Sequence, residues 1–143
     1  NRFMVNASSS VIFFEALGIP KGRKTEQEFR IPGWIFNCEL WQKRLFLAAL
    51  FGSELRKPHK RANRKHNFIA PTFPFAKLKE LEGNGIDYLS DISRLLGDFE
   101  IKTTCIQKHR EIITKKGSIS SQLELVISPA AENLICLWSK IGF

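Results

Sequence analysis

The sequence predicts an α+β domain, and three observations lead to this fold class. Apolar residues recur at helical spacing in several segments, alternate with polar ones in others, and a glycine turn joins two alternating segments. A length of 143 residues fits one domain, and a hydrophobic content of 43% is enough for a real core. The predicted order is a helix, two weakly extended segments, a helix, strands with a hairpin, and a final helix.

The N-terminal part contains two predicted helices and a polar connector. A short strand over residues 3–6 precedes a helix that ends at Gly18. Residues 21–33 form the connector. The next helix is capped by Asn37 and runs to about Glu54. Because this helix is apolar on nearly every side, we expect it to be buried.

The middle of the chain contains an extended segment and a helix. Residues 68–76 alternate like a strand, and Pro71 and Pro74 place it at a sheet edge or break it. Residues 79–85 are a predicted turn. Ile86, Leu89, Ile92 and Leu96 then recur at helical spacing, and Gly97 ends that helix.

The C-terminal part contains strands and a last helix. Residues 99–105, 110–115 and 119–127 are predicted strands, and a turn at residues 116–118 joins the last two. Leu123, Leu125 and Ile127 should face the same way. Ser128 and Pro129 begin the last helix, and its predicted apolar face consists of Leu134, Ile135, Trp138 and Ile141.

The net charge of +8 is unevenly distributed, which favours a polyanionic partner such as nucleic acid or an anionic membrane surface. Residues 55–79 contain no acid, and residues 101–123 contain only Glu111. A disordered basic loop explains residues 56–66 equally well, but two basic stretches with strand-like alternation favour a basic sheet face. The predicted DNA-binding residues are Arg56, Lys57, Lys60, Arg61, Arg64, Lys65, Lys77, Lys102, Lys108, Arg110, Lys115 and Lys116.

The cysteines and tryptophans provide only broad expectations. Three scattered cysteines form neither a disulfide framework nor a zinc pattern, and they favour an intracellular (cytoplasmic) setting. No apolar run is long enough to span a membrane. We expect Trp34, Trp41 and Trp138 in the core, and Cys38 and Cys136 buried as small hydrophobes.

The two ends of the chain resemble each other at a constant offset of 124 residues. The matched positions are Val11, Phe13, Phe14, Leu17 and Gly18 with Ile135, Leu137, Trp138, Ile141 and Gly142. One interpretation makes residues 1–20 the tail of a preceding repeat and residues 21–143 the domain. Chance explains the match equally well, because short apolar helices that end in glycine are common.

Residues 47–55 combine small side chains with a carboxylate at the end of a helix. The small residues Ala48, Ala49, Gly52 and Ser53 form pairs four residues apart, a spacing that lets two helices approach closely. If a second such helix packs symmetrically, Glu54 and its counterpart meet near one axis. Two close carboxylates repel unless a cation lies between them, and oxygen ligands suit Mg²⁺.

This segment resembles the motif of the LAGLIDADG homing endonucleases, of the archaeal and intein-associated type. Residues 17–25, 29–35, 88–101 and 132–143 resemble the surroundings of that motif. The resemblance implies an αββαββα half whose basic, saddle-shaped antiparallel sheet binds double-stranded DNA, with the helices on its other face. It further implies Mg²⁺-dependent cleavage with Glu54 as metal ligand and catalytic carboxylate, and a paired motif helix from a second copy or from an N-terminal half. Glu54→Gln should then abolish cleavage and leave binding nearly intact.

The sequence also departs from that motif, and other functions stay open. Gly52 stands where the motif has its first acid, and Leu55 stands where it has glycine. One alternative is a relative that binds DNA or RNA without cleaving it, such as a splicing cofactor or a regulator. Another is a half whose missing partner carries the stronger catalytic acid.

Overall fold

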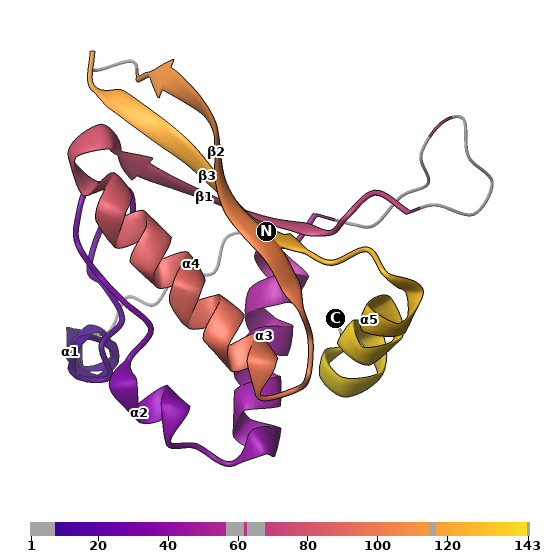
Figure 1. The fold of residues 1–143 in the computed structure, drawn as a ribbon. Helices are drawn as coiled ribbons and strands as arrows, with labels where there is room; N and C mark the ends of the chain where they lie inside the picture. The colour runs from indigo at the N-terminus through magenta and orange to yellow at the C-terminus, as the bar shows by residue number, and fades with distance from the viewer. Residues whose placement is uncertain (1–7, 57–61, 63–67, 115–116, 143) are drawn as a thin grey trace.

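The computed structural model describes residues 8–56, 62, 68–114 and 117–142. This part of the chain is α+β, as the sequence predicted, and it has a three-stranded antiparallel sheet and five α-helices (Figure 1). The elements are α1 (Ser8–Ala16), α2 (Gly33–Phe36), α3 (Leu40–Glu54), β1 (Thr72–Leu78), a 3-10 turn (Lys79–Leu81), α4 (Glu82–Gly97), β2 (Thr103–Ile113), β3 (Ile119–Ile127) and α5 (Ala131–Cys136), which continues into a π-helical turn (Leu137–Ile141).

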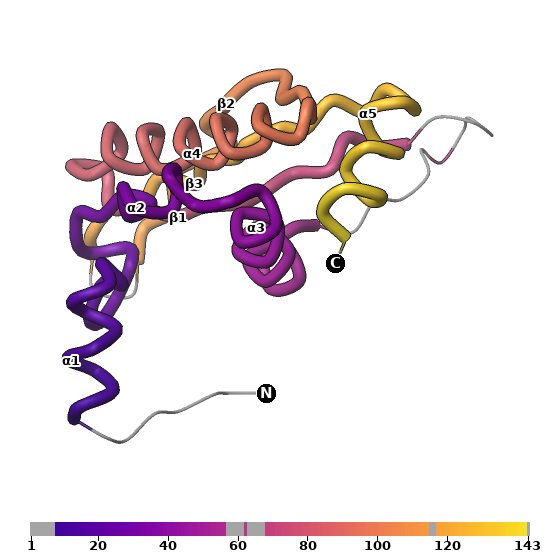
Figure 2. The backbone as a smooth tube through the Cα atoms, turned by 90° about the horizontal axis from the view of Figure 1, so that it is seen from below, coloured from indigo at the N-terminus to yellow at the C-terminus, as the bar shows by residue number. Residues whose placement is uncertain are grey.

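The sheet carries its helices on one side. Its strand order is β1-β3-β2, with both neighbouring pairs antiparallel. Helix α4 contacts all three strands, and α3 contacts β1 and the C-terminal π-helical turn. Figures 1 and 2 show α3 and α4 along the same side of the sheet, while α1 projects away from the body. We call the opposite side of the sheet the open face.

Alternation along the strands determines which side chains meet the helices. In β3, Leu123, Leu125 and Ile127 are buried against α4, as their spacing predicted. In β1, the alternation places Phe73 and Phe75 in the same layer. The α4 residues Leu89, Ile92, Leu95 and Leu96 fill the other half of this core. Ile86, which the helical spacing assigned to the same face, is 41% exposed.

The predicted hairpin and edge strand are both present. Gly117 has a φ of 82° between β2 and β3, a left-handed conformation that glycine adopts without strain. The Thr114 N–H donates to the Ser118 carbonyl and closes this turn. Strand β1, which follows Pro71 and contains Pro74, lies at an edge of the sheet.

The predicted strand over residues 99–105 is wrong for its first half. The N–H groups of Phe99 and Ile101 both donate to the Leu96 carbonyl, so these residues form the turn that ends α4. Their side chains are buried in this turn. The alternation of apolar residues therefore reflects packing of a helix end, and a single longer strand, β2, replaces the two predicted shorter ones.

The boundaries of two helices also differ from their predicted positions. Helix α3 begins at Leu40 rather than after Asn37, because the Glu39 N–H donates to the Gln42 Oε1 atom (3.0 Å) in a capping box. Helix α4 begins at Glu82, within the predicted turn. The described order therefore has one strand between α3 and α4, where the predicted αββαββα order has two; most of residues 57–67 lie outside the described residues.

Several apolar side chains that the sequence assigned to the core are exposed. Only Leu47 and Phe51 of α3 are fully buried, so the prediction of a buried helix is wrong for this chain by itself. Trp34, Trp41 and Trp138 are 49%, 63% and 38% exposed, and Ile135 is also exposed. Cys38 and Cys136 are half-buried, and Cys105 is exposed. Periodicity identifies an apolar face but not the surface that covers it.

Two further predictions concern the chain ends and membranes. Gly18 and Gly142, which match in the proposed repeat, both have positive φ, 89° and 72°. The repeat itself stays a prediction, and the strand predicted at residues 3–6 lies outside the described residues. In the described part of the chain, no helix is long and apolar enough to cross a membrane.

Gly85 of α4 lies directly against the sheet. A Cβ atom there would lie 2.7 Å from Leu123 Cδ1 and 3.0 Å from Lys77 Cγ. We expect Gly85→Ala to lower the free energy of unfolding by roughly 1–3 kcal/mol, because two buried side chains must move. The matched control is Gly83→Ala, since a Cβ at Gly83 meets nothing within 4 Å. Urea denaturation of both variants tests the contact, and equal losses would contradict it.

Burial of Tyr88 makes the stability of the fold fall at alkaline pH. Its ring stacks on Phe75 at a centroid distance of 4.6 Å, and burial raises its pKa to about 12, with smaller contributions from Glu54 and Asp91. The unfolded chain releases this proton near pH 10 and the folded chain retains it, so stability falls between pH 10 and 12, by about 3 kcal/mol in total. Tyr88→Phe should lose less stability over this range in denaturant titrations. Identical pH slopes in both proteins would contradict this origin.

Candidate nucleic-acid interface

The motif carboxylate lies at the end of α3, paired with a lysine of the connector. Lys24 Nζ lies 2.5 Å from Glu54 Oε1. Among the described residues, no three His, Cys, Asp or Glu side chains gather closely enough to hold a metal ion. The described residues of this single chain therefore do not fit the Mg²⁺ site that the resemblance implied, because they offer no set of three ligands and Glu54 pairs with a cation.

The predicted helix-pairing residues divide between the surface and the core. Ala49, Gly52 and Ser53 are exposed on α3, whereas Ala48 packs partly against the core. Trp41 and Leu45 are exposed on the same side as Ala49 and Gly52, since residues four and eleven apart share a helix face. We call Trp41, Leu45, Ala49 and Gly52 the α3 stripe. It is apolar or small along its whole length.

The pairing of the strands defines which residues occupy the open face. Along β1 and β3, every second side chain is buried against the helices, so the side chains between them point to the open face. The residues of β2 that pair with these open-face residues of β3 lie on the same face. The open face consists of Thr72, Pro74, Ala76, Leu78, Ser120, Gln122, Glu124, Val126, Cys105, Gln107, Arg110 and Ile112.

A β-bulge brings Arg110 to the open face. The register of β2 shifts between Lys108 and Arg110, so that Gln107 pairs with Glu124 and Arg110 pairs with Gln122. In a regular strand, residues 107 and 110 would face opposite sides of the sheet. The extra residue at the bulge places both on the same side. The exposed Arg110 is therefore a cation of the open face.

Lys108 lies on the other side of the sheet. Its ammonium group contacts Glu82 of α4 at 2.8 Å and Glu111 at 2.7 Å. The hydrogen bonds with Glu111 and Glu82 raise the pKa of Lys108, and the bond from Lys108 is the largest cause that lowers the pKa of each carboxylate. Strand alternation and these two acids therefore remove Lys108 from the predicted DNA-binding surface.

Lys77 is also absent from the open face. Its side chain is fully buried, its ammonium donates to the Gln27 carbonyl, and it lies 4.2 Å from the centre of the Phe29 ring. Burial lowers the pKa of this ammonium, while Glu28 opposes the shift. The prediction that Lys77 contacts DNA is therefore corrected. Lys77 attaches the connector to the sheet, a role that a charge pattern alone does not distinguish from phosphate binding.

Arg56 is the second cation of the open side, and it has an acidic partner. Its N–H donates to the Thr72 carbonyl at the end of β1. Its Nη1 atom lies 2.7 Å from Oε1 of Glu124, whose side chain is only 7% exposed, whereas the Arg56 side chain is 55% exposed. Sequence analysis missed Glu124. Its position between the inward-facing Leu123 and Leu125 was the available signal.

The remaining predicted basic residues are only partly placed. Lys102 is exposed after α4, and its N–H donates to Asn133 Oδ1 at 2.7 Å. The other seven lie outside the described residues; they are Lys57, Lys60, Arg61, Arg64, Lys65, Lys115 and Lys116.

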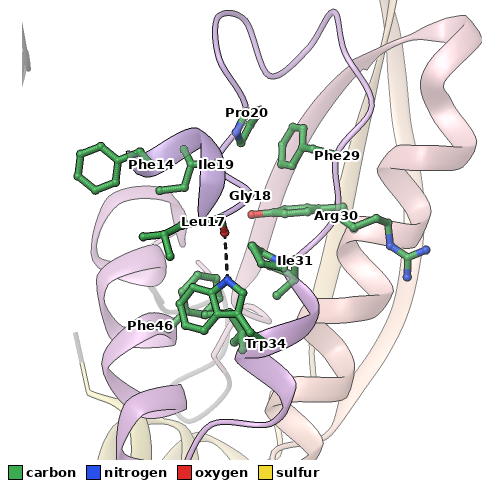
Figure 3. Close-up of a pocket in the computed structure, with 13 residues that line it drawn as sticks. Phe14, Leu17, Gly18, Ile19, Pro20, Phe29, Arg30, Ile31, Trp34 and Phe46 are labelled. Carbon is green, nitrogen blue, oxygen red and sulfur yellow. Dashed lines mark hydrogen bonds between the residues drawn. The ribbon is translucent and has the colours of Figure 1, made fainter. Parts of the chain in front are cut away.

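An apolar pocket of about 240 Å³ lies between α1, the connector, α2, α3 and α4 (Figure 3). Phe14, Ile19 and Phe46 contribute to its lining. Two of its polar side chains already have partners: Trp34 Nε1 donates to the Leu17 carbonyl at 3.0 Å, and the Arg30 guanidinium makes two 2.7 Å hydrogen bonds to the buried Asp91. The residues that line the pocket therefore offer little chemistry for catalysis.

Comparisons with known proteins give relatives with three kinds of names, one of them a replication factor C small subunit that is 22% identical over 97% of this chain. The chain is 36% identical to a tRNA-splicing ligase RtcB of Pyrococcus abyssi over 85% of its own length and 12% of that protein. It is 31% identical to the ligase of the same name from Methanopyrus kandleri over 97% of its length and 13% of that protein. It is also 36% identical to the DNA-directed RNA polymerase subunit Rpo1N of Methanocaldococcus jannaschii, over 70% of its length and 7% of that protein. The chain thus spans about an eighth of the ligases.

These names contradict the resemblance to LAGLIDADG homing endonucleases. Four relatives are named tRNA-splicing ligases, at 31–36% identity across most of this chain. The predicted intein- or intron-type, Mg²⁺-dependent DNA endonuclease is corrected on that basis, and with it the catalytic role of Glu54. No family model matches the chain. No solved structure matches it either, so the specific LAGLIDADG fold has no support beyond the α+β class.

Proposed function

We propose that this chain is a nucleic-acid-binding module, carried within larger proteins, that binds duplex DNA on its open face without cleaving it. The observation that carries the proposal is the bulge in β2, which places Arg110 on the side of the sheet that α3 and α4 leave uncovered. Arg56 lies on the same side. The sequence directly after Arg56 adds Lys57, Lys60, Arg61, Arg64 and Lys65. This charge favours phosphates over a neutral ligand.

The chemistry of the open face favours a duplex over a single strand. Sheets that bind single strands stack bases on aromatic side chains. The described residues of the open face include no aromatic ring and instead present amides, hydroxyls and Arg110. A two-stranded β-ribbon fits the major groove of B-form DNA, whereas the major groove of A-form RNA is too narrow for side chains. Duplex DNA is therefore the partner that we propose.

The comparisons support a module that is separable from the rest of its relatives. One segment accounts for 12–13% of tRNA-splicing ligases and 7% of an RNA polymerase subunit. Since proteins with different names share this segment, we infer that the segment supplies none of the named activities. Binding is a function that can be shared between such proteins.

A second candidate is RNA binding that supports tRNA splicing. The four ligase names favour it, because these relatives are 31–36% identical to this chain over 85–97% of its length. The two candidates are distinguished by competition: an unlabelled tRNA transcript that displaces the chain more effectively than duplex DNA would favour RNA. Displacement chiefly by duplex DNA would favour the first.

Arg110 and Lys108 are a matched pair that tests the open face. Arg110→Ala should weaken binding to a random-sequence duplex and reduce the slope of log affinity against log salt by about one, because a phosphate-facing cation is lost. Lys108→Ala should leave that slope unchanged, because Glu82 and Glu111 already neutralise its ammonium group. Fluorescence anisotropy at several salt concentrations measures both. Equal effects of the two substitutions would contradict the assignment of the faces.

We also propose that the α3 stripe pairs with the same stripe of a second copy. Trp41 and Leu45 are 63% and 56% exposed, and a Cβ atom at Gly52 would meet nothing within 4 Å. Small residues let a second helix approach closely, and a twofold axis buries the same patch twice. The stripe has no charge that would select a partner of opposite sign. A second copy therefore fits it better than a charged partner does.

Leu45→Glu tests this pairing. A carboxylate in the α3 stripe should convert a dimer into a monomer, because pairing would bury two unpaired charges. Leu40→Glu is the control: Leu40 is similarly exposed, at 55%, but lies about 100° around the helix from Trp41. Sedimentation velocity measures the mass of each. A monomeric parent protein at high concentration would rule out the pairing.

A further inference from the structure

The Arg56–Glu124 pair combines a buried acid with an exposed base on the open face. Glu124 belongs to the central strand, with Pro74 of β1 and Gln107 of β2 as its register partners. Although it lies on the open face, its side chain is only 7% exposed. The Arg56 guanidinium lies 2.7 Å from Glu124 Oε1 and remains 55% exposed.

This arrangement is too unfavourable for a simple stabilising contact. Burial of a carboxylate in the middle of a sheet costs free energy unless hydrogen bonds satisfy it. Among the described residues, Oε1 of Glu124 accepts no hydrogen bond of regular geometry, and the Arg56 guanidinium at 2.7 Å is the charge that compensates it. A pair of apolar residues would fill the same space without that cost. The Glu124 carboxylate thus holds the Arg56 guanidinium in place although its burial lowers the stability of the fold. Such a pair is better explained by a role in binding than by a role in stability.

We propose that Arg56 recognises guanine in the major groove and that Glu124 is the positioning residue that orients its guanidinium. This inference rests on the proposed binding of duplex DNA. A guanidinium has five N–H donors in a rigid planar fork. Glu124 lies against one side of the group, and the exposed side would donate two parallel hydrogen bonds to O6 and N7 of guanine. Without Glu124, the same side chain would sample many rotamers.

The backbone around Arg56 restricts the direction of approach. The hydrogen bond from its N–H to the Thr72 carbonyl fixes the chain at the edge of β1 directly after α3 ends. Gln107 and Gln122 lie beside Glu124 and Arg110 on the same face. Their amides suit other base edges, so Arg56 belongs to a polar surface rather than to an isolated ion pair.

Selection of bound sequences from a random duplex library tests the proposal. The parent protein should enrich guanine at one position. Arg56→Lys keeps the charge but removes the fork, so guanine preference at that position should fall by roughly tenfold while the salt dependence of binding is retained. Glu124→Gln should broaden the preference at the same position, because the guanidinium loses its orientation. The control is Arg23→Lys, in another exposed arginine–glutamate pair, 3.1 Å from Glu26 and outside the open face.

The outcomes separate this inference from the proposed function. A parent protein that binds no duplex contradicts the proposed function itself. A parent protein that binds duplex, with the same selected sequence for Arg56→Lys as for the parent, contradicts the role of Arg56 alone. Uniform weakening across all sequences would assign Arg56 to a phosphate and overturn guanine recognition. If Glu124→Gln does not fold, judged by its thermal unfolding, the Arg56→Lys result still decides, because Arg56 is exposed.

Discussion

The packing of α4 across all three strands is the contact on which the rest of the structure depends. It requires that one side of every strand be apolar and that the helix approach closely, which Gly85 permits where it meets Leu123. Once α4 occupies one side of the sheet, the alternation of side chains directs every other strand residue to the opposite side. The open face is thus a consequence of how the core is built, and its composition is left free for binding.

The position of α4 on one side of the sheet also decides which basic residues face the open face. Basic residues that alternation directs toward α4 acquire acidic or carbonyl partners, as Lys108 and Lys77 do, and no longer attract phosphates. Arg110 lies on the open face only because the bulge in β2 moves it to that side of the sheet. A net charge of +8 therefore overstates the number of cations that the described surface offers to a polyanion. Charge that is paired inside one chain contributes little to attraction at long range.

The relatives change the functional interpretation more than the fold does. A segment that recurs in proteins of different names, and that accounts for a small fraction of each, supports the binding module that we propose. The exposed stripe on α3 and the exposed apolar residues of α1 indicate further surfaces that a larger assembly or a second copy would cover. A motif of small and apolar residues does not by itself specify a catalytic site. In this chain its one carboxylate, Glu54, is paired with Lys24.

The sequence by itself determined the α+β class, the hairpin at Gly117, the edge position of β1 and the buried face of β3. Each of these depends on local chemistry: a glycine at positive φ, prolines without an N–H, and alternation with a period of two. Only the tertiary structure decided the ends of the helices, the exposure of the tryptophans and the side of the sheet that each basic residue faces. These depend on partners distant in sequence, such as Glu82 for Lys108 and Glu124 for Arg56, and on a bulge that shifts the register by one residue.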